Sequence, residues 1–351
     1  MSHLSVVMTT AQVAQTTGDN TATLPSSHGA ALYFGCAVIV IGIVGTAANA
    51  LVLYALVASK QHKKLPLILN QNLLDLTSSL LLAVVYALKI SSIYLTGLLG
   101  YWLCMLLLSE NLIWFAIEGS VINLAVIAVE RYLKIVRPIW SRKHMGKSTE
   151  YLLSALPWIL SFLYNMTVTF QTSAVIDGVC HAFIVWDSRI VQMIYALFYF
   201  LAFYPFMLLI FVVCYGRILV AIRRQAAVMA GHVTAGTTVQ QTAAQIQENK
   251  IQSNVIKTMI VVCAFYAVGW LPENVYYLLT NFETDFTMLQ SGYYAVMFIA
   301  FLNICANPFI YAAKFDPVKQ KLLMLVPCKP GNSVGTAAAS GTPAVIATRV
   351  A

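Results

Sequence analysis

The chain is short of charge. Of its 351 residues only 10% are Asp, Glu, Lys or Arg, whereas 60% are hydrophobic. A water-soluble domain carries about 25% charged residues, so this composition excludes a soluble domain of such length. The sequence instead predicts an integral membrane protein.

The chain also lacks the residue clusters of an enzyme or a metal centre. Its six histidines are isolated in expected loops and tails, where none can pair with a nucleophile. Its seven cysteines form no Cys-x-x-Cys pair. The net charge of +8 comes from basic residues in short loops beside helix ends. We therefore expect no enzymatic activity, no required cofactor and no nucleic-acid partner.

Seven apolar segments reach the roughly 20 residues that a helix needs to cross a bilayer. They cover residues 31–58, 66–89, 103–134, 151–173, 190–221, 254–280 and 288–312. Of the 21 Lys and Arg residues, 18 fall on one side of this topology. Only Lys89 and Arg189 fall on the other side, with Arg131 at the boundary. Because basic loops stay in the cytoplasm, we predict that the N-terminus lies outside.

The composition divides the chain into three parts. These are an extracellular tail, the seven-helix domain and a cytoplasmic tail, at residues 1–30, 31–326 and 327–351. Both tails and the stretch 223–252 have compositions typical of disorder. Residues 315–326 are expected to form an amphipathic helix on the inner membrane surface. Cys328 beyond it is either a palmitoylation site or a plain cytosolic thiol. The one glycosylation triplet begins at Asn165, inside the fourth segment, and should be helical.

Short polar and proline motifs recur along the segments in a fixed order. They are Asn49, Asp75, Glu130-Arg131-Tyr132 with Pro138, Trp158, Trp270-x-Pro272 and Asn307-Pro308-x-x-Tyr311. Together, across residues 31–328, they resemble the rhodopsin-like (class A) G-protein-coupled receptors. The resemblance implies an all-α membrane fold, a seven-transmembrane helix bundle with a short amphipathic C-terminal helix, in the plasma membrane. Because no lysine precedes Lys314 in the seventh segment, an opsin is excluded.

The resemblance implies that an extracellular ligand activates a heterotrimeric G protein at the inner face. The residues that it assigns to this coupling are Glu130, Arg131, Tyr132, Tyr215, Asn307, Pro308 and Tyr311. Many relatives carry an acid on the sixth segment that holds the arginine, but this chain has Gln252 there. We therefore expect Arg131 to be held mainly by Glu130, and basal signalling to be noticeable.

The resemblance also implies an allosteric sodium ion in the middle of the bundle. Its ligands would be Asp75, Ser120, Asn303 and Asn307, next to Trp270. Carboxylate, hydroxyl and amide oxygens suit a hard cation. The alternative is a structural hydrogen-bond network that holds water and no ion.

In the family a disulfide ties the third segment to the second external loop. Here Cys104 and Cys180 are the two cysteines expected to face the oxidising exterior. From Cys104 to Arg131 there are 27 residues, about 40 Å of helix at 1.5 Å per residue. This is two residues longer than the usual family spacing, as is the interval from Pro205 to Tyr215. Either these helices contain bulges or Cys104 lies above its helix.

The outer half of the bundle is where the resemblance places the ligand. The expected contacts are Trp114, Ile117, Glu118, Tyr195, Tyr199, Trp270, Glu273, Asn274, Tyr277, Tyr293 and Met297. Two intramembrane glutamates among aromatic rings suit a peptide or a cationic small molecule. A lipid or neutral metabolite is the alternative ligand, with either glutamate protonated or hydrogen-bonded within the bundle. Ile113 occupies the position of the amine-receptor aspartate, which argues against the usual monoamine anchor.

Two other functions compete with a ligand-activated receptor. A transporter or channel would favour internal repeats and broken helices along a path through the membrane, which the sequence does not show. A receptor-like protein without an agonist would act constitutively or as a scaffold. Serines and threonines in the C-terminal tail suggest receptor kinases and an arrestin as further partners, beside the membrane lipid.

Overall fold

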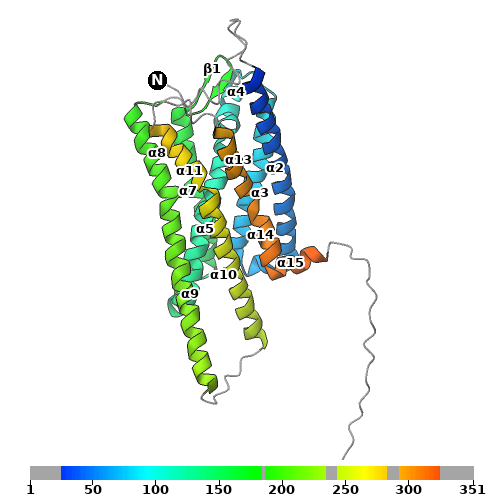
Figure 1. Ribbon diagram of the computed structural model, residues 1–351, viewed down its shortest axis with the longest axis vertical. Helices are drawn as coiled ribbons and strands as arrows, with labels where there is room; N and C mark the ends of the chain where they lie inside the picture. The colour runs from blue at the N-terminus through cyan, green and yellow to red at the C-terminus, as the bar shows by residue number, and fades with distance from the viewer. Residues whose placement is uncertain (1–24, 184–185, 235–242, 283–291, 325–351) are drawn as a thin grey trace, which may run out of the picture.

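The computed structural model describes residues 25–183, 186–234, 243–282 and 292–324. Within these ranges, seven helical stretches are long and apolar enough to cross a membrane, and they stand side by side in one elongated bundle (Figure 1). The crossings are α2 (Pro25–Ala58), α3 (Pro66–Ile90), α4 (Gly97–Leu103) with η2 (Cys104–Leu108) and α5 (Asn111–Val136), α7 (Lys147–Thr172), α8 (Arg189–Phe203) with α9 (Pro205–Thr234), α10 (Ala243–Gly269) with α11 (Leu271–Phe282), and α13 (Tyr293–Ile304) with α14 (Ala306–Lys314). The predicted seven-helix fold is confirmed.

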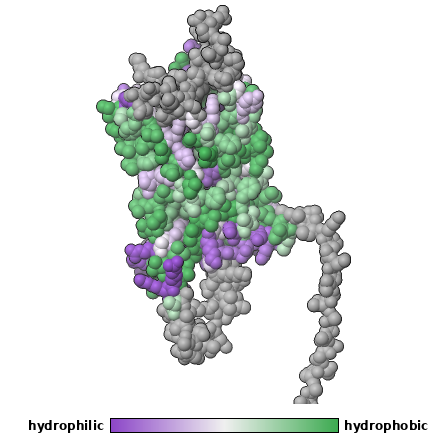
Figure 2. Space-filling model, in the orientation of Figure 1, coloured by the Kyte–Doolittle hydropathy of each residue, from purple (hydrophilic) through white to green (hydrophobic). Residues whose placement is uncertain are grey.

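Apolar side chains face outward from the bundle, while many polar ones face inward. Val40, Val212 and Val268 are well exposed, whereas Asn72 and Asn123 are fully buried. Figure 2 shows the resulting apolar belt, with hydrophilic residues gathered near its lower rim. This inversion of a soluble protein is what a hydrocarbon surrounding requires, because buried polar groups then find partners inside the protein.

Short elements cap the two ends of the bundle. One end, here called the hairpin end, carries strands β1 (Ala174–Ile176) and β2 (Val179–His181), paired antiparallel with Val175 opposite Cys180. Asp177 and Gly178 form the turn, both with positive φ, as tight hairpin turns require. The other end, here called the α15 end, carries η1 (Gln61–Lys63), α6 (Pro138–His144) and α15 (Asp316–Leu323).

The amphipathic helix is present as α15. Its apolar residues Phe315 and Val318 are buried, while Lys319 is exposed. The lysine side is therefore free to meet a charged surface, as predicted. Residues 325–351 lie outside the described residues, and so do Cys328 and the predicted C-terminal tail.

Three of the membrane crossings are interrupted close to a proline. The fifth breaks at Tyr204 before Pro205, the sixth at Trp270 before Pro272, and the seventh at Cys305 before Pro308. A proline removes one backbone donor and clashes with the preceding turn, which accounts for the first two breaks. The segments below and above each break can therefore change their relative angle.

The third crossing is also broken, and of the two alternatives for its additional length the structure shows the bulge. A π-helical turn, η2, begins at Cys104 and ends before Ser109, and Glu110 has a left-handed backbone with φ 64°. The additional residues before Arg131 are accommodated by this wider turn and break, while Cys104 remains inside the helical stretch. Between Pro205 and Tyr215, in contrast, α9 runs without a break.

Several expected boundaries differ from those of the structure. Helix α2 begins at Pro25, inside the predicted tail 1–30. The stretch 223–252 was expected to be disordered, but α9 continues to Thr234 and α10 begins at Ala243. Its alanines, glutamines and arginines have high helix propensity, so the two helices extend beyond the membrane. Of the free cysteines in the described residues, Cys36 is exposed, whereas Cys214, Cys263 and Cys305 are buried.

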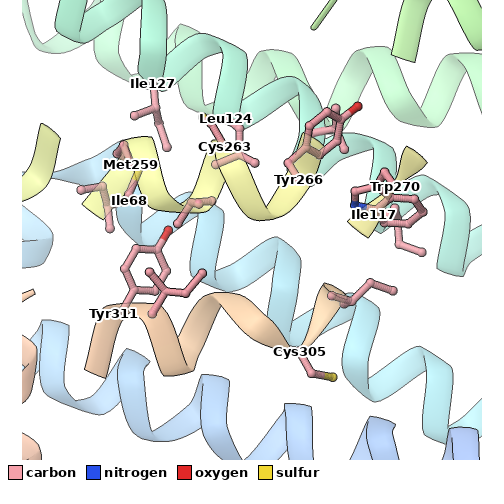
Figure 3. Close-up of a cluster of buried hydrophobic side chains, with 14 of the residues drawn as sticks. Ile68, Ile117, Leu124, Ile127, Met259, Cys263, Tyr266, Trp270, Cys305 and Tyr311 are labelled. Carbon is pink, nitrogen blue, oxygen red and sulfur yellow. The ribbon is translucent and has the colours of Figure 1, made fainter. Parts of the chain in front are cut away.

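A buried apolar cluster runs through the bundle and includes its α15 half. Figure 3 shows side chains from α3, α5, α10 and α14 meeting there, including Ile68, Ile127, Met259 and Tyr311. These four are each at most 1% exposed. Interiors of this kind pack closely and resist continuous deformation, so the helices that share the cluster move as discrete units.

Candidate functional site

A cavity of about 140 Å³ opens at the hairpin end, between α5, α7, α8, α11 and α13. Its wall is mostly aromatic. Among the described residues that line it, only Glu118 on α5 and Glu273 on α11 are charged. Both carboxylates are buried, at 3% and 4% exposure.

Amides, and no basic side chain, accompany these two carboxylates. Asn165 Nδ2 on α7 donates to Glu118 Oε2 at 2.6 Å, and Asn274 Nδ2 donates to Glu273 Oε2 at 3.0 Å. Within the described part of the chain, neither glutamate has a Lys, Arg or His partner. A buried carboxylate without a counter-ion is costly, so the cavity favours a cationic occupant or protonation.

The structure brings most of the predicted ligand contacts together. The cavity is lined by Trp114, Glu118, Tyr195, Tyr199, Glu273, Tyr277, Tyr293 and Met297. Three expected contacts do not line it. Ile117 and Trp270 face a second, deeper cavity, and Asn274 is turned back to donate to Trp270 O at 3.0 Å. The ring centroids of Trp114 and Trp270 lie 6.4 Å apart, between the two cavities.

Sequence reasoning missed the wall that comes from α7 and the hairpin. Its members are Asn165, Val168, Thr169, Phe183 and Trp186. The structure places Asn165 in a helix, as predicted, and buries it, so that its amide serves Glu118 and presents no glycan acceptor. Trp186 donates to Phe183 O at 2.9 Å and packs on Tyr195 at 5.3 Å between ring centroids. The only signal in the sequence that could have indicated this wall was the presence of aromatic residues shortly after Cys180.

Further contacts missed from the sequence lie on α8 and α11. They are Gln192, Tyr276, Thr280 and Asn281. Gln192 Nε2 donates to Asn281 Oδ1 at 2.9 Å, which joins the fifth and sixth crossings beside the cavity mouth. Because the two amides lie far apart in the sequence, no local pattern marked them as a pair.

The predicted disulfide is confirmed. Cys104 and Cys180 are bonded, with their Cα atoms 5.3 Å apart. The bond joins η2 of the third crossing to strand β2, and Leu95 N donates to Gly178 O at 2.9 Å on the other side of the hairpin. The disulfide and this hydrogen bond together hold the β1–β2 hairpin against the end of the bundle.

The deeper cavity, of about 20 Å³, lies beside Asp75, and all four predicted sodium ligands line it. Ser120 Oγ donates to Asp75 Oδ1 at 2.6 Å, and Asn307 Nδ2 donates to Asp75 Oδ2 at 2.8 Å. In the orientation that satisfies its amide, Asn303 accepts from Trp270 Nε1 at 2.6 Å. Asp75 is 1% exposed and has no basic partner in the described chain. A lone buried carboxylate beside room for one water-sized particle fits a small cation.

Arg131 is held at the α15 end of α5. Its Nε lies 2.8 Å from Glu130 Oε2, and its Nη1 donates to Gln252 Oε1 on α10 at 2.6 Å. Arg131 was expected to be held mainly by Glu130, and the neutral amide of Gln252 adds a second contact across the bundle. This contact joins the third and sixth crossings, so the bundle is closed at this end.

Two of the predicted coupling tyrosines point into this region without a partner. The hydroxyls of Tyr215 and Tyr311 are buried and make no hydrogen bond within the described residues. Tyr132 packs against the neighbouring apolar cluster. The closed bundle thus leaves two hydroxyls available for a rearranged Arg131.

Glu130 is shared with a second cation that the sequence did not single out. Lys134 Nζ lies 2.5 Å from Glu130 Oε1 and 3.0 Å from Glu150 Oε1 on α7. Arg131, Glu130, Lys134 and Glu150 therefore form a chain of alternating charge from the third to the fourth crossing. The spacing of four between Glu130 and Lys134 places them on one helix face and could have signalled the pair.

A further ion pair lies at the hairpin end. Lys89 Nζ is 2.5 Å from Glu110 Oε1, and the glutamate is 2% exposed. The ammonium also lies 5.2 Å from the centre of the Tyr86 ring. The break in the third crossing turns Glu110 inward, so the ammonium of Lys89 is paired inside the protein at this end.

Within the described residues, seven helices long and apolar enough to cross a membrane, a mostly aromatic cavity with two buried carboxylates at one end and a held arginine at the other give the architecture of a seven-helix membrane receptor. The sequence model of the 7 transmembrane receptor (rhodopsin family) matches residues 48–311. The chain belongs to this family. It is a multi-pass membrane protein and a receptor, and the match gives no support to a transporter.

Several curated proteins are similar to the chain. A tachykinin-like peptides receptor of Drosophila melanogaster is 25% identical over 77% of this chain and 52% of its own length. A lysophosphatidic acid receptor 3 of Rattus norvegicus is 25% identical over 69% and 65%. A substance-K receptor of Homo sapiens is 23% identical over 84% and 72%. The chain thus spans about half the length of the fly receptor.

Proposed function

We propose that the chain is a plasma-membrane G-protein-coupled receptor with its N-terminus outside. The hairpin end then faces the exterior, and a cationic ligand, either a peptide or a small molecule, binds in the cavity between α5, α7, α8, α11 and α13. Binding favours an arrangement in which the α15 end opens to a heterotrimeric G protein.

The pair of buried glutamates carries the choice of ligand. Glu118 and Glu273 reach one cavity from two crossings and have no cationic partner among the described residues. A ligand ammonium or guanidinium would neutralise them, and the surrounding tyrosines and Trp114 would add cation–π contact.

The named relatives point to two ligand classes, and the charge of the cavity separates them. One is named for tachykinin-like peptides, one for substance K and one for lysophosphatidic acid. The phosphate head of such a lipid would meet two carboxylates and, among the described lining residues, no basic side chain. Juxtaposed like charges cost several kcal/mol, which favours the peptide or amine.

The coupling step would begin with Arg131. Outward movement of α10, which is broken from α11 at Trp270, separates Gln252 from the arginine. The freed guanidinium can then meet the partner helix and the unpaired hydroxyls of Tyr215 and Tyr311. Receptor kinases and an arrestin would act on residues 327–351, and palmitoylation at Cys328 would fasten that tail to membrane lipid beside α15.

A sodium ion beside Asp75 would favour the closed bundle. The ion supplies a positive charge to a buried carboxylate, while Ser120, Asn303 and Asn307 provide further oxygens around the same cavity. Because the cavity lies between α3, α5, α10 and α14, its contraction on opening would expel the cation.

The ligand proposal is tested by removing one charge at a time. Glu118→Gln and Glu273→Gln keep the size of each side chain, so an amine or peptide agonist found by nucleotide exchange in membranes should lose potency at least tenfold in each variant. Asp177→Asn is the matched control, because Asp177 lies in the exposed hairpin turn outside the cavity. A cationic agonist that is indifferent to both glutamate substitutions would remove the proposal.

A further inference from the structure

Gln71 reaches the centre of the sodium site. It lies on α3, one turn before Asp75, and is fully buried. Its amide nitrogen donates to Asp75 Oδ1 at 3.2 Å and also to Ser120 Oγ. The side chain therefore directs N–H donors at two of the oxygens that a cation would use.

A relay of amides fixes the direction of this donation. Asn123 Nδ2 on α5 donates to Gln71 Oε1 at 2.8 Å, so the nitrogen of Gln71 must face Asp75. Asn70 Nδ2 in turn donates to Asn123 Oδ1 at 2.9 Å, and Trp158 Nε1 on α7 donates to Asn70 Oδ1 at 2.8 Å. An indole nitrogen can only donate, which sets the orientation of every amide after it.

The whole relay therefore ends on the carboxylate. An ionised carboxylate has about four acceptor positions. Ser120 and Gln71 occupy two on Oδ1, and Asn307 occupies one on Oδ2. One acceptor position on Oδ2 remains, and both Asp75 and Ser120 line the small cavity. A cation there can use the one lone pair that Gln71 leaves free on Ser120, but the partly positive N–H groups of Gln71 then point at two of its oxygen ligands and weaken their hold on it.

We propose that Gln71 is a positioning residue that competes with sodium for Asp75 and Ser120 and thereby lowers the affinity of the site for the ion. The inference rests on the sodium ion of the proposed function and adds a consequence for this chain. The oriented amide dipoles offset part of the buried negative charge, so the closed bundle depends less on the ion than a bundle without the amide would.

Thermal unfolding of the purified full chain tests this without any ligand. Wild type and Gln71→Met are titrated with NaCl at constant ionic strength, with choline chloride making up the difference. Methionine has a similar length and no donor, so the site loses one hydrogen bond to a charged group. The sodium concentration that gives half of the rise in Tm should be about tenfold lower in Gln71→Met.

Two further variants define the controls. Asp75→Asn should abolish the sodium-dependent rise in Tm, because it removes the charge that attracts the ion. Gln61→Met makes the same substitution at a mostly buried glutamine in η1, away from Asp75, and should respond as wild type does. Gln71→Leu serves as a second apolar variant should Gln71→Met not be recovered folded.

The outcomes separate this inference from the sodium proposal. If half of the rise in Tm is reached at a lower sodium concentration in Gln71→Met than in wild type, both the sodium site and the role of Gln71 are supported. An equal sodium response in wild type and variant overturns the role of Gln71 and leaves the ion in place. If neither protein responds to sodium, the ion and the competition are both overturned.

Discussion

Replacing Gln252 by Glu should quieten the receptor in the absence of ligand. The amide oxygen of Gln252 accepts from Arg131 Nη1 at 2.6 Å across the α15 end. A carboxylate of the same length at this position would turn a neutral acceptor into an ionised one, which adds ion-pair attraction to a bond whose donor already carries a charge.

The size of the effect follows from that bond. Ion pairs between partly exposed side chains contribute about 0.2–1 kcal/mol, and the burial of Arg131 places this pair at the upper end of that range. In free-energy terms 1.4 kcal/mol is about a factor of ten in an equilibrium. Because Gln252 is only partly buried, solvent screening reduces the change. We expect ligand-free activity to fall by about threefold.

The measurement is ligand-free nucleotide exchange on a purified heterotrimeric G protein, normalised to the amount of receptor in the membrane. Gln252→Ala removes the contact and should raise exchange, while Gln252→Glu should lower it. Gln61→Glu adds the same charge at the same end of the bundle without facing Arg131, and controls for a general effect of charge. Exchange that is no lower in Gln252→Glu and no higher in Gln252→Ala would refute the reasoning.

Two further ion pairs give predictions of their own. Lys134→Met should lower ligand-free exchange by about twofold to threefold, because Glu130 is then left entirely to Arg131; an increase in the same assay would show that the tie to Glu150 matters more. Lys89→Met and Glu110→Gln should each lower the Tm, and the double variant should lose less than the sum, with a coupling of about 1–3 kcal/mol. Additive losses in this double-mutant cycle would mean that the 2.5 Å pair contributes nothing.

Periodic and compositional features of the sequence were sufficient to predict the seven-helix bundle. Apolar runs and basic loops predicted seven helices, and the family resemblance carried by one motif for each crossing predicted the bond between Cys104 and Cys180. These features are local in sequence, and the physical constraint behind them is strong, because hydrocarbon tolerates only hydrogen-bonded helices.

Contacts between crossings were predictable only where a family motif marked both partners. Asp75, Ser120 and Asn307 were expected together and lie together. Asn165 beside Glu118 was not expected, because each reads as an ordinary helix residue and only packing brings them together. Glu110 was missed for another reason. Its position depends on a left-handed backbone, which a non-glycine residue rarely adopts and a helical pattern does not reveal.

The break at Glu110 divides the third crossing into a collar and a lever. The collar, α4 and η2, is joined by disulfide to the hairpin. The lever, α5, has 26 residues, about 39 Å at 1.5 Å per residue, and carries Trp114 and Glu118 near one end and Arg131 near the other. A ligand in the proposed site would therefore contact the same rigid helix that the proposed G protein contacts at its other end, while the collar can shift with the loop. Loop residues and residues 97–108 could accordingly be exchanged between receptors as one unit, with the lever retained.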